Sequence, residues 1–160
     1  MGVIKVPQEI KVGVSAARIF KAMMIESFTL YPKIMPTFIK SYDLLQGDGG
    51  AGSIVQTTFH DGSPFSHVKH KIDSLDTKSF ATKYSLIEGA LLGDKLESIH
   101  FDSKFEDSGN GGCIIKIINE YHTKGDSELK EEEIKAINDQ ALGFYKVTEE
   151  YLLAHPDVCA

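Results

Sequence analysis

Hydrophobic and polar residues alternate along much of the chain before residue 124, which is the pattern of strands with one buried face. In residues 3–12 the even positions are mostly apolar and the odd positions mostly polar. Residues 97–106 and 113–121 alternate in the same way, although Ile114 and Ile118 interrupt the second stretch. We therefore expect strands that bury one face, with the outer face of residues 113–121 partly covered.

Turn-forming residues separate further short strands after Pro36. These turn signals stand at residues 47–52, 61–64, 76–78, 88–89 and 109–112. Such close and regular spacing is typical of an antiparallel meander.

A helical pattern follows the first strand, with Ser15 as its expected N-cap. Its apolar residues have the spacing of a core-facing stripe; they are Ile19, Phe20, Met23 and Met24. Because Pro32 and Pro36 break the run, we expect a second short helix to end near Lys33.

The long helical pattern of the chain covers residues 128–154, with acidic residues crowding its first turns. Its apolar residues recur at steps of three and four; they are Ile134, Ile137, Ala141, Phe144, Val147 and Tyr151. The order of elements predicts one α+β domain, in which this helix lies across the concave face of a curved antiparallel sheet of about seven strands.

Composition excludes several functional classes. The 160 residues carry a net charge of −6, which argues against nonspecific nucleic-acid binding. Acidic residues interrupt the densest group of lysines, so we interpret it as a solvated face; the group is Lys69, Lys71, Lys78 and Lys83. The sequence shows neither a signal peptide nor a membrane span, and we expect a cytoplasmic protein that does not bind membranes.

The two cysteines do not form a disulfide framework. Cys113 lies in an apolar strand, where we expect burial to raise the pKa of its thiol and to argue against a nucleophilic role.

A glycine-rich loop, with glycines at Gly47, Gly49, Gly50 and Gly52, matches the spacing of a dinucleotide-binding loop. That function requires a helix after the loop, whose N-terminal N–H groups face the pyrophosphate. Here residues 39–45 and 53–59, on either side of the loop, both have the composition of strands. We therefore predict a turn between two strands, and we expect no cofactor.

Four motifs give the chain a close resemblance to the plant pathogenesis-related class-10 proteins, the family of the major birch pollen allergen. They are GDGGAGS at 47–53, YSLIEG at 84–89, YHTKGD at 121–126 and EYLLAH at 150–155. The resemblance covers the whole chain. It implies a helix-grip fold, in which two short helices and the long terminal helix close a large apolar cavity against the sheet. It also implies a defence or stress protein, often allergenic, that binds amphipathic small molecules such as flavonoids, cytokinins or steroids.

The residues themselves cannot distinguish a hollow interior from a solid core, because both produce the same apolar periodicity. The resemblance favours a cavity. Strand parity and family position then predict the residues that face a ligand: Phe59, Tyr84, Ile99, Phe101, Ile137, Ala141 and Phe144. We expect the polar groups of Tyr84 and His70 to orient the ligand.

His67 and His70 form an HxxH pair that could suggest a metal site. On a strand, residues three apart point to opposite faces and cannot converge on one ion. We therefore expect no metal.

Ribonuclease activity is the alternative function, and the family resemblance assigns it to Glu97, Glu149 and Tyr151 together with a loop lysine. This chain has Val55 and Gln56 where relatives carry lysine after the glycine loop. Glu149 and Tyr151 also stand two apart on a helix and do not share a face. We therefore expect a poor acid–base site.

Two further activities occur among relatives. Some condense alkaloid precursors with a Lys, Asp, Glu and Tyr set, of which only Lys69 has a candidate position near the cavity mouth. Others are hormone receptors that inhibit a protein phosphatase through a proline-rich gate loop, but the corresponding residues 88–93 contain no proline. We prefer a carrier to either activity.

Overall fold

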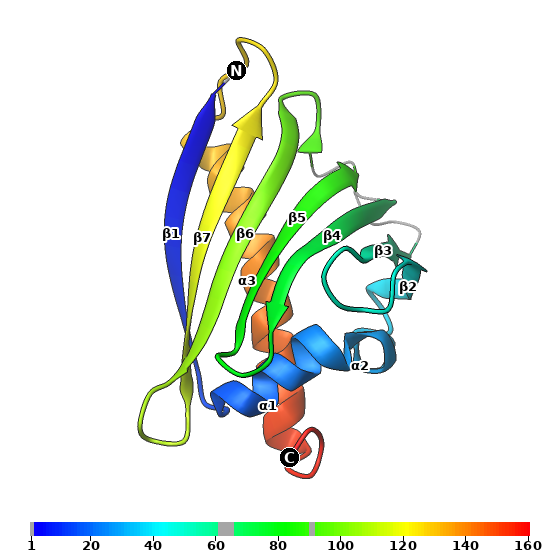
Figure 1. Ribbon diagram of the computed structural model, residues 1–160, viewed down its shortest axis with the longest axis vertical. Coiled ribbons are helices and arrows are strands. Elements are labelled where there is room, and N and C mark those ends of the chain that lie inside the picture. The colour runs from blue at the N-terminus through cyan, green and yellow to red at the C-terminus, as the bar shows by residue number, and fades with distance from the viewer. Residues whose placement is uncertain (1, 61–65, 90–91) are drawn as a thin grey trace.

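The computed structural model describes residues 2–60, 66–89 and 92–160 and contains a curved antiparallel sheet of seven strands (Figure 1). The strands are β1 (Val3–Val12), β2 (Ile39–Gln46), β3 (Ile54–Phe59), β4 (His67–Asp76), β5 (Ala81–Gly89), β6 (Leu96–Asp107) and β7 (Cys113–Thr123). They are ordered β1-β7-β6-β5-β4-β3-β2, so β2 to β7 form the predicted meander and β1 pairs with β7. The turn predicted at 61–64 lies outside the described residues.

Alternation sets the two faces of the sheet. On β6, Ile99, Phe101 and Phe105 are buried, as their shared parity predicts. The pairing of β4 with β5 shifts register between Ile72 and Ser74. A bulge of this kind bends a strand and increases its twist, and here it contributes to the concavity that receives the helices.

Three short helical segments follow β1: α1 (Ala16–Phe20), the π-helical turn η1 (Lys21–Ile25) and α2 (Ser27–Ile34). Ser15 holds the N-cap position of α1, but its side chain makes no capping bond. The Ala16 N–H instead donates to Asp107 Oδ1 at 2.9 Å. This carboxylate belongs to the end of β6, so the local sequence around Ser15 could not reveal it.

Pro32 lies inside α2, close to its end, in agreement with the predicted end near Lys33. A proline removes one intrahelical hydrogen bond, and α2 continues for two residues beyond it. The helix ends at Ile34, just before Met35 and Pro36. The π-helical turn, in contrast, was not predicted, because apolar spacing does not report a single extra residue in a turn.

The long helix α3 (Glu131–Ala154) lies across the concave face of the sheet (Figure 1). It begins three residues later than predicted, where Glu133 Oε1 accepts a hydrogen bond from the Lys130 N–H. Its most buried residues are Ile137, Tyr145, Thr148 and Leu152. The predicted stripe contained only Ile137 of these. Tyr145 and Thr148 weaken a purely apolar pattern, and Leu152 stands one position after Tyr151, which the stripe included instead.

Arg18 of α1 fixes the carboxyl end of α3. Its guanidinium donates to the carbonyl oxygens of Leu152 at 2.8 Å, His155 at 2.6 Å and Val158 at 2.9 Å. Such a planar group with several donors suits the unpaired carbonyls at a helix end. Within the described part of the chain, no helix is long and apolar enough to cross a membrane.

Candidate ligand-binding cavity

A cavity of about 160 Å³ lies between the inner face of the sheet and the helices η1, α2 and α3. Most of its wall is apolar or aromatic. From the sheet it is lined by Tyr42, Val55, Thr57, Phe59, Val68, His70, Ile72, Leu75, Thr82, Tyr84, Leu86 and Phe101. From the helices it is lined by Met23, Met24, Ser27, Phe28, Tyr31, Ile137, Gln140, Ala141, Phe144 and Tyr145.

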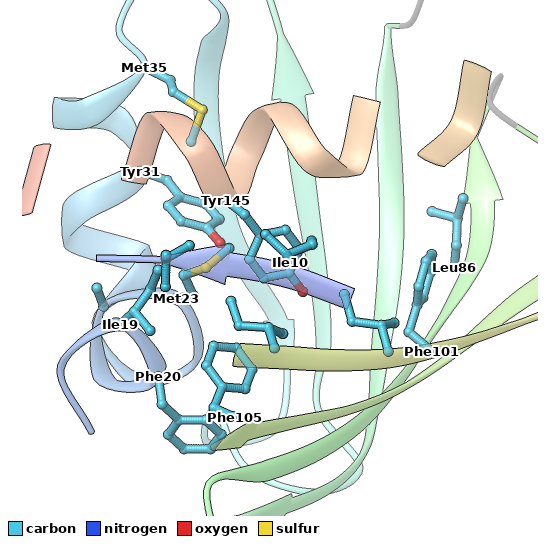
Figure 2. Close-up of a cluster of buried hydrophobic side chains, with 14 of the residues drawn as sticks. Ile10, Ile19, Phe20, Met23, Tyr31, Met35, Leu86, Phe101, Phe105 and Tyr145 are labelled. Carbon is cyan, nitrogen blue, oxygen red and sulfur yellow. The ribbon is translucent and has the colours of Figure 1, made fainter. Parts of the chain in front are cut away.

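Aromatic rings shape this wall. Tyr84 and Phe101 on neighbouring strands stack with centroids 4.8 Å apart, and Tyr31 packs against Phe144 at 6.0 Å. Figure 2 shows Tyr31 and Tyr145 coming from the helices, and Phe101 from the sheet. Flat rings on several sides are suited to a flat apolar ligand.

The cavity is smaller than the resemblance implies. Pockets for drug-sized ligands hold roughly 300–1,000 Å³, whereas a cavity of about 150 Å³ accepts a single benzene ring. The reason is the number of large side chains in the wall, among them Phe28, Tyr31 and Phe144. A ligand with several fused rings therefore requires some of these side chains to move.

The structure places seven of the eight predicted ligand-facing residues at the cavity wall. They are Phe59, His70, Tyr84, Phe101, Ile137, Ala141 and Phe144. Ile99 does not line it: the side chain is fully buried, and its register partners on β5 and β7 are Leu86 and Tyr121. Strand parity predicts which face of the sheet a side chain lies on. It does not predict whether neighbouring side chains leave that side chain exposed to the cavity.

His70 is a titratable residue of the cavity wall whose pKa is altered by burial. Burial lowers the pKa of its imidazole to about 4, so the ring is neutral at physiological pH. Its centroid lies 5.7 Å from that of Tyr84. Burial likewise raises the pKa of Tyr31, Tyr42 and Tyr84. The wall of the cavity therefore presents neutral polar groups.

Several polar lining residues were missed at the sequence level. Thr57 and Thr82 share the parity of their inward-facing neighbours, so strand alternation could have found them. Tyr31 and Tyr145 lie on helices. Their position against the sheet depends on how the helices are packed, which the sequence pattern leaves open.

His67 and His70 point to opposite faces of β4, as the strand geometry predicts. His67 Nε2 lies 2.9 Å from Glu88 Oε2, and Lys69 Nζ lies 3.2 Å from the same oxygen. Lys69 is thus paired with Glu88 and does not line the cavity. In the three described ranges no group of three His, Cys, Asp or Glu side chains could hold a metal ion.

The three residues of the ribonuclease hypothesis are not brought together. Glu97 is exposed and follows Leu96, which pairs with Thr123 at one end of β7. Glu149 Oε2 accepts a hydrogen bond from the N–H of Gly13, which follows the pairing of Val12 with Cys113 at the other end. The 11 residues of β7 separate these positions, a length of about 34 Å for an antiparallel strand.

The thiol of Cys113 is buried, and this burial raises its pKa to about 11. A thiol with so high a pKa is protonated at neutral pH and is a weak nucleophile. This agrees with the expectation from the strand pattern.

The glycine-rich loop joins β2 to β3, as predicted, and its own N–H groups are largely used. Gly49 N–H donates to Ser53 Oγ and Gly50 N–H to Asp48 Oδ1, both at 2.9 Å. Gly52 N–H donates to the carbonyl of Ile72 at 2.7 Å. The loop is therefore a closed turn tied to β4, with few donors left for an anion. The gate-loop position at 88–93 lies partly outside the described residues.

Comparison with known proteins agrees with this architecture. The family model of the pathogenesis-related protein Bet v 1 family matches residues 1–155. Pathogenesis-related protein STH-21 of Solanum tuberosum is 49% identical over all of both chains, and major allergen Pru av 1 of Prunus avium is 45% identical over 98% of both. The crystal structure of Ara h 8.0201 superposes with a TM-score of 0.87 at 32% identity, covering 96% of this chain and all of that one.

Proposed function

The chain belongs to the pathogenesis-related protein Bet v 1 family, and from this premise we propose that it is a non-enzymatic carrier of amphipathic small plant metabolites. The carrier would act in the cytoplasm, in the plant's response to pathogens or stress. The observation that carries the proposal is the apolar, aromatic-lined cavity between the sheet and α3, with its few neutral polar groups. Ligand-binding pockets typically combine such a wall with a few polar anchors.

Binding would come mainly from apolar burial. Removing apolar surface from water contributes about 25 cal/mol per Å², and an aromatic ring of about 150 Å² gains roughly 4 kcal/mol before the costs of association. We therefore expect modest affinity and broad ligand choice. Single-ring and two-ring phenols should bind most readily, whereas flavonoids, cytokinins and steroids need side chains such as Phe144 to move.

Catalysis by the ribonuclease set receives less support. Glu97 and Glu149 lie at opposite ends of β7, and a general acid and base must both reach the same substrate. The receptor alternative rests on family resemblance rather than on a described residue.

Calorimetric titration with a panel of a phenol, a flavonoid, a cytokinin and a steroid tests the proposal, beside an RNA-degradation assay on the same nuclease-free preparation. We expect saturable binding of at least the phenol and no RNA cleavage. Failure of every panel member to bind would contradict the carrier function. RNA cleavage that is abolished by Glu97→Ala would support a ribonuclease function. Ligand-dependent inhibition of a type 2C phosphatase would support a receptor function.

A further inference from the structure

Strand β1 is one edge of the sheet: among the described residues it has β7 on one side and no strand on the other (Figure 1). It pairs with β7 over all ten of its residues without a register shift. The opposite edge strand, β2, has two register shifts in its pairing with β3. Such bulges protect an edge from pairing with another chain, whereas a long regular strand invites that pairing. β1 therefore requires protection of another kind.

The backbone hydrogen bonds of β1 alternate between its two sides. Just before the strand, the carbonyl oxygen of Gly2 accepts a hydrogen bond from the Thr123 N–H at 2.9 Å, in the same register as the strand pair. In an antiparallel ladder every second residue bonds to the same neighbour. The even-numbered residues of β1 therefore bond to β7, and the N–H and C=O groups of the odd-numbered residues point outward.

Two side chains of α3 cover the carboxyl end of this edge. Lys146 Nζ donates to the carbonyl oxygen of Lys11 at 2.8 Å, and the Gly13 N–H donates to Glu149 Oε2 at 2.6 Å. Both backbone groups belong to odd-numbered residues, in agreement with the alternation. Lys146 Nζ also lies 3.4 Å from Glu149 Oε1. A further strand can reach this end of β1 only after the two side chains have moved.

Pro7 interrupts the middle of the same edge. It is exposed, and its register partner on β7 is Ile118. As an odd-numbered residue Pro7 faces outward, where a proline has no N–H to offer a further strand. The missing donor is on the outer side, so Pro7 removes no hydrogen bond between β1 and β7. Pro7 thus blocks pairing at the edge without weakening the sheet.

The sequence of β1 identifies the partner that this arrangement excludes. Two copies of the strand can be placed antiparallel, with Pro7 of one opposite Pro7 of the other. Lys5 of each copy then lies opposite Glu9 of the other, and Ile4 lies opposite Ile10. Opposite charges and apolar side chains at facing positions stabilise a strand pair, so β1 is complementary to itself. At the centre, however, both hydrogen bonds of the facing residues are missing because neither proline has an N–H.

We propose that Pro7, Lys146 and Glu149 form an edge guard, which prevents two copies of this chain from joining their sheets through β1. Pro7 removes the central hydrogen bonds of that dimer. The two α3 side chains cover the end at which Val3 of the second copy would pair with Lys11. The edge guard is independent of the cavity and of what the cavity binds.

The first test restores the missing N–H with Pro7→Thr, since threonine is favoured in strands. Sedimentation velocity over a series of protein concentrations measures the association of two copies. We expect the wild type to remain a monomer. The Pro7→Thr dimer should be at least about tenfold tighter, because the central pair gains two hydrogen bonds. Glu9→Thr is the matched control: it introduces the same residue at an outward position that already has an N–H, and it should associate no more than the wild type.

Two second-site changes test whether the dimer uses the β1 edge. Adding Lys5→Pro to Pro7→Thr removes another outward N–H and should return the protein to a monomer. Adding Lys146→Ala to Pro7→Thr uncovers the carboxyl end of the edge and should strengthen the dimer further. Circular dichroism and urea unfolding establish whether each variant is folded.

Several results would overturn the edge guard. One is a folded Pro7→Thr protein that associates no more than the wild type. Another is a dimer that persists after Lys5→Pro or is equally tight in Glu9→Thr, because it would not depend on the N–H at position 7. A wild type that already dimerises through β1 would also contradict the proposal. So would a Pro7→Thr chain that fails to fold, since an exposed residue that faces away from β7 should not be required for folding.

Discussion

At the scale of single residues, His70 is the lining residue that connects the cavity to solution pH. Its pKa in the folded protein is about 4, against 6.5 for an ordinary histidine. Between these two values the unfolded chain binds more protons than the folded one. Stability is therefore complete above pH 6.5 and is lost as the pH falls toward 4.

We expect the free energy of unfolding to fall by about 2–3 kcal/mol more in the wild type than in His70→Gln when the pH is lowered from 7.5 to 4.5. Urea unfolding at the two pH values measures this difference. The variant serves as the control for all other titrating groups. Parallel losses in both proteins would show that His70 is not desolvated in the folded state.

Residue-level prediction from sequence succeeded where strand parity decides the answer. Phe59, Tyr84 and Phe101 are at the cavity wall because alternate residues of a strand share a face. It failed for Ile99, whose neighbours enclose it, and it missed Tyr145. A tyrosine beside Phe144 on a helix cannot be assigned to the cavity or the core until the rotation of the helix is known.

At the scale of elements, the glycine-rich loop is a structural turn whose positions differ in what they tolerate. Gly47 has a φ of +92°, and a Cβ there would lie 2.8 Å from Ser53 Cα. At Gly50 the nearest atom to an added Cβ is the flexible Asp48 Oδ1, at 3.2 Å. The same substitution should therefore have different costs at these two positions.

Gly47→Ala should lower the free energy of unfolding by about 3 kcal/mol, because it combines backbone strain with a clash against backbone. Gly50→Ala should lower it by less than about 1 kcal/mol. Urea unfolding of the two variants provides the measurement. Equal effects would mean that the turn is flexible rather than fixed by its conformation.

Element boundaries were predictable where a local signal exists. The strands and the turn between β2 and β3 follow from alternation and glycines. The π-helical turn and the capping of α1 by Asp107 did not follow. Each depends on a residue distant in the sequence or on the packing of the helix pair.

At the scale of the whole molecule, the central property is a space that remains between sheet and helices. Apolar periodicity describes both a solid and a hollow interior, so the cavity was expected only through family resemblance. The cavity volume of about 160 Å³ is smaller than the family resemblance implied. Volume depends on the sizes and rotamers of all side chains in the wall together, and no local pattern encodes it.

The most direct test of this account compares two identical substitutions on α3. Ala141 lines the cavity, whereas Ala136 is exposed. Ala141→Leu fills part of the cavity at a modest cost in stability, and calorimetric titration should show at least a tenfold loss of phenol affinity, while Ala136→Leu should bind like the wild type. Equal phenol binding by the two variants would contradict the claim that ligands bind inside this cavity.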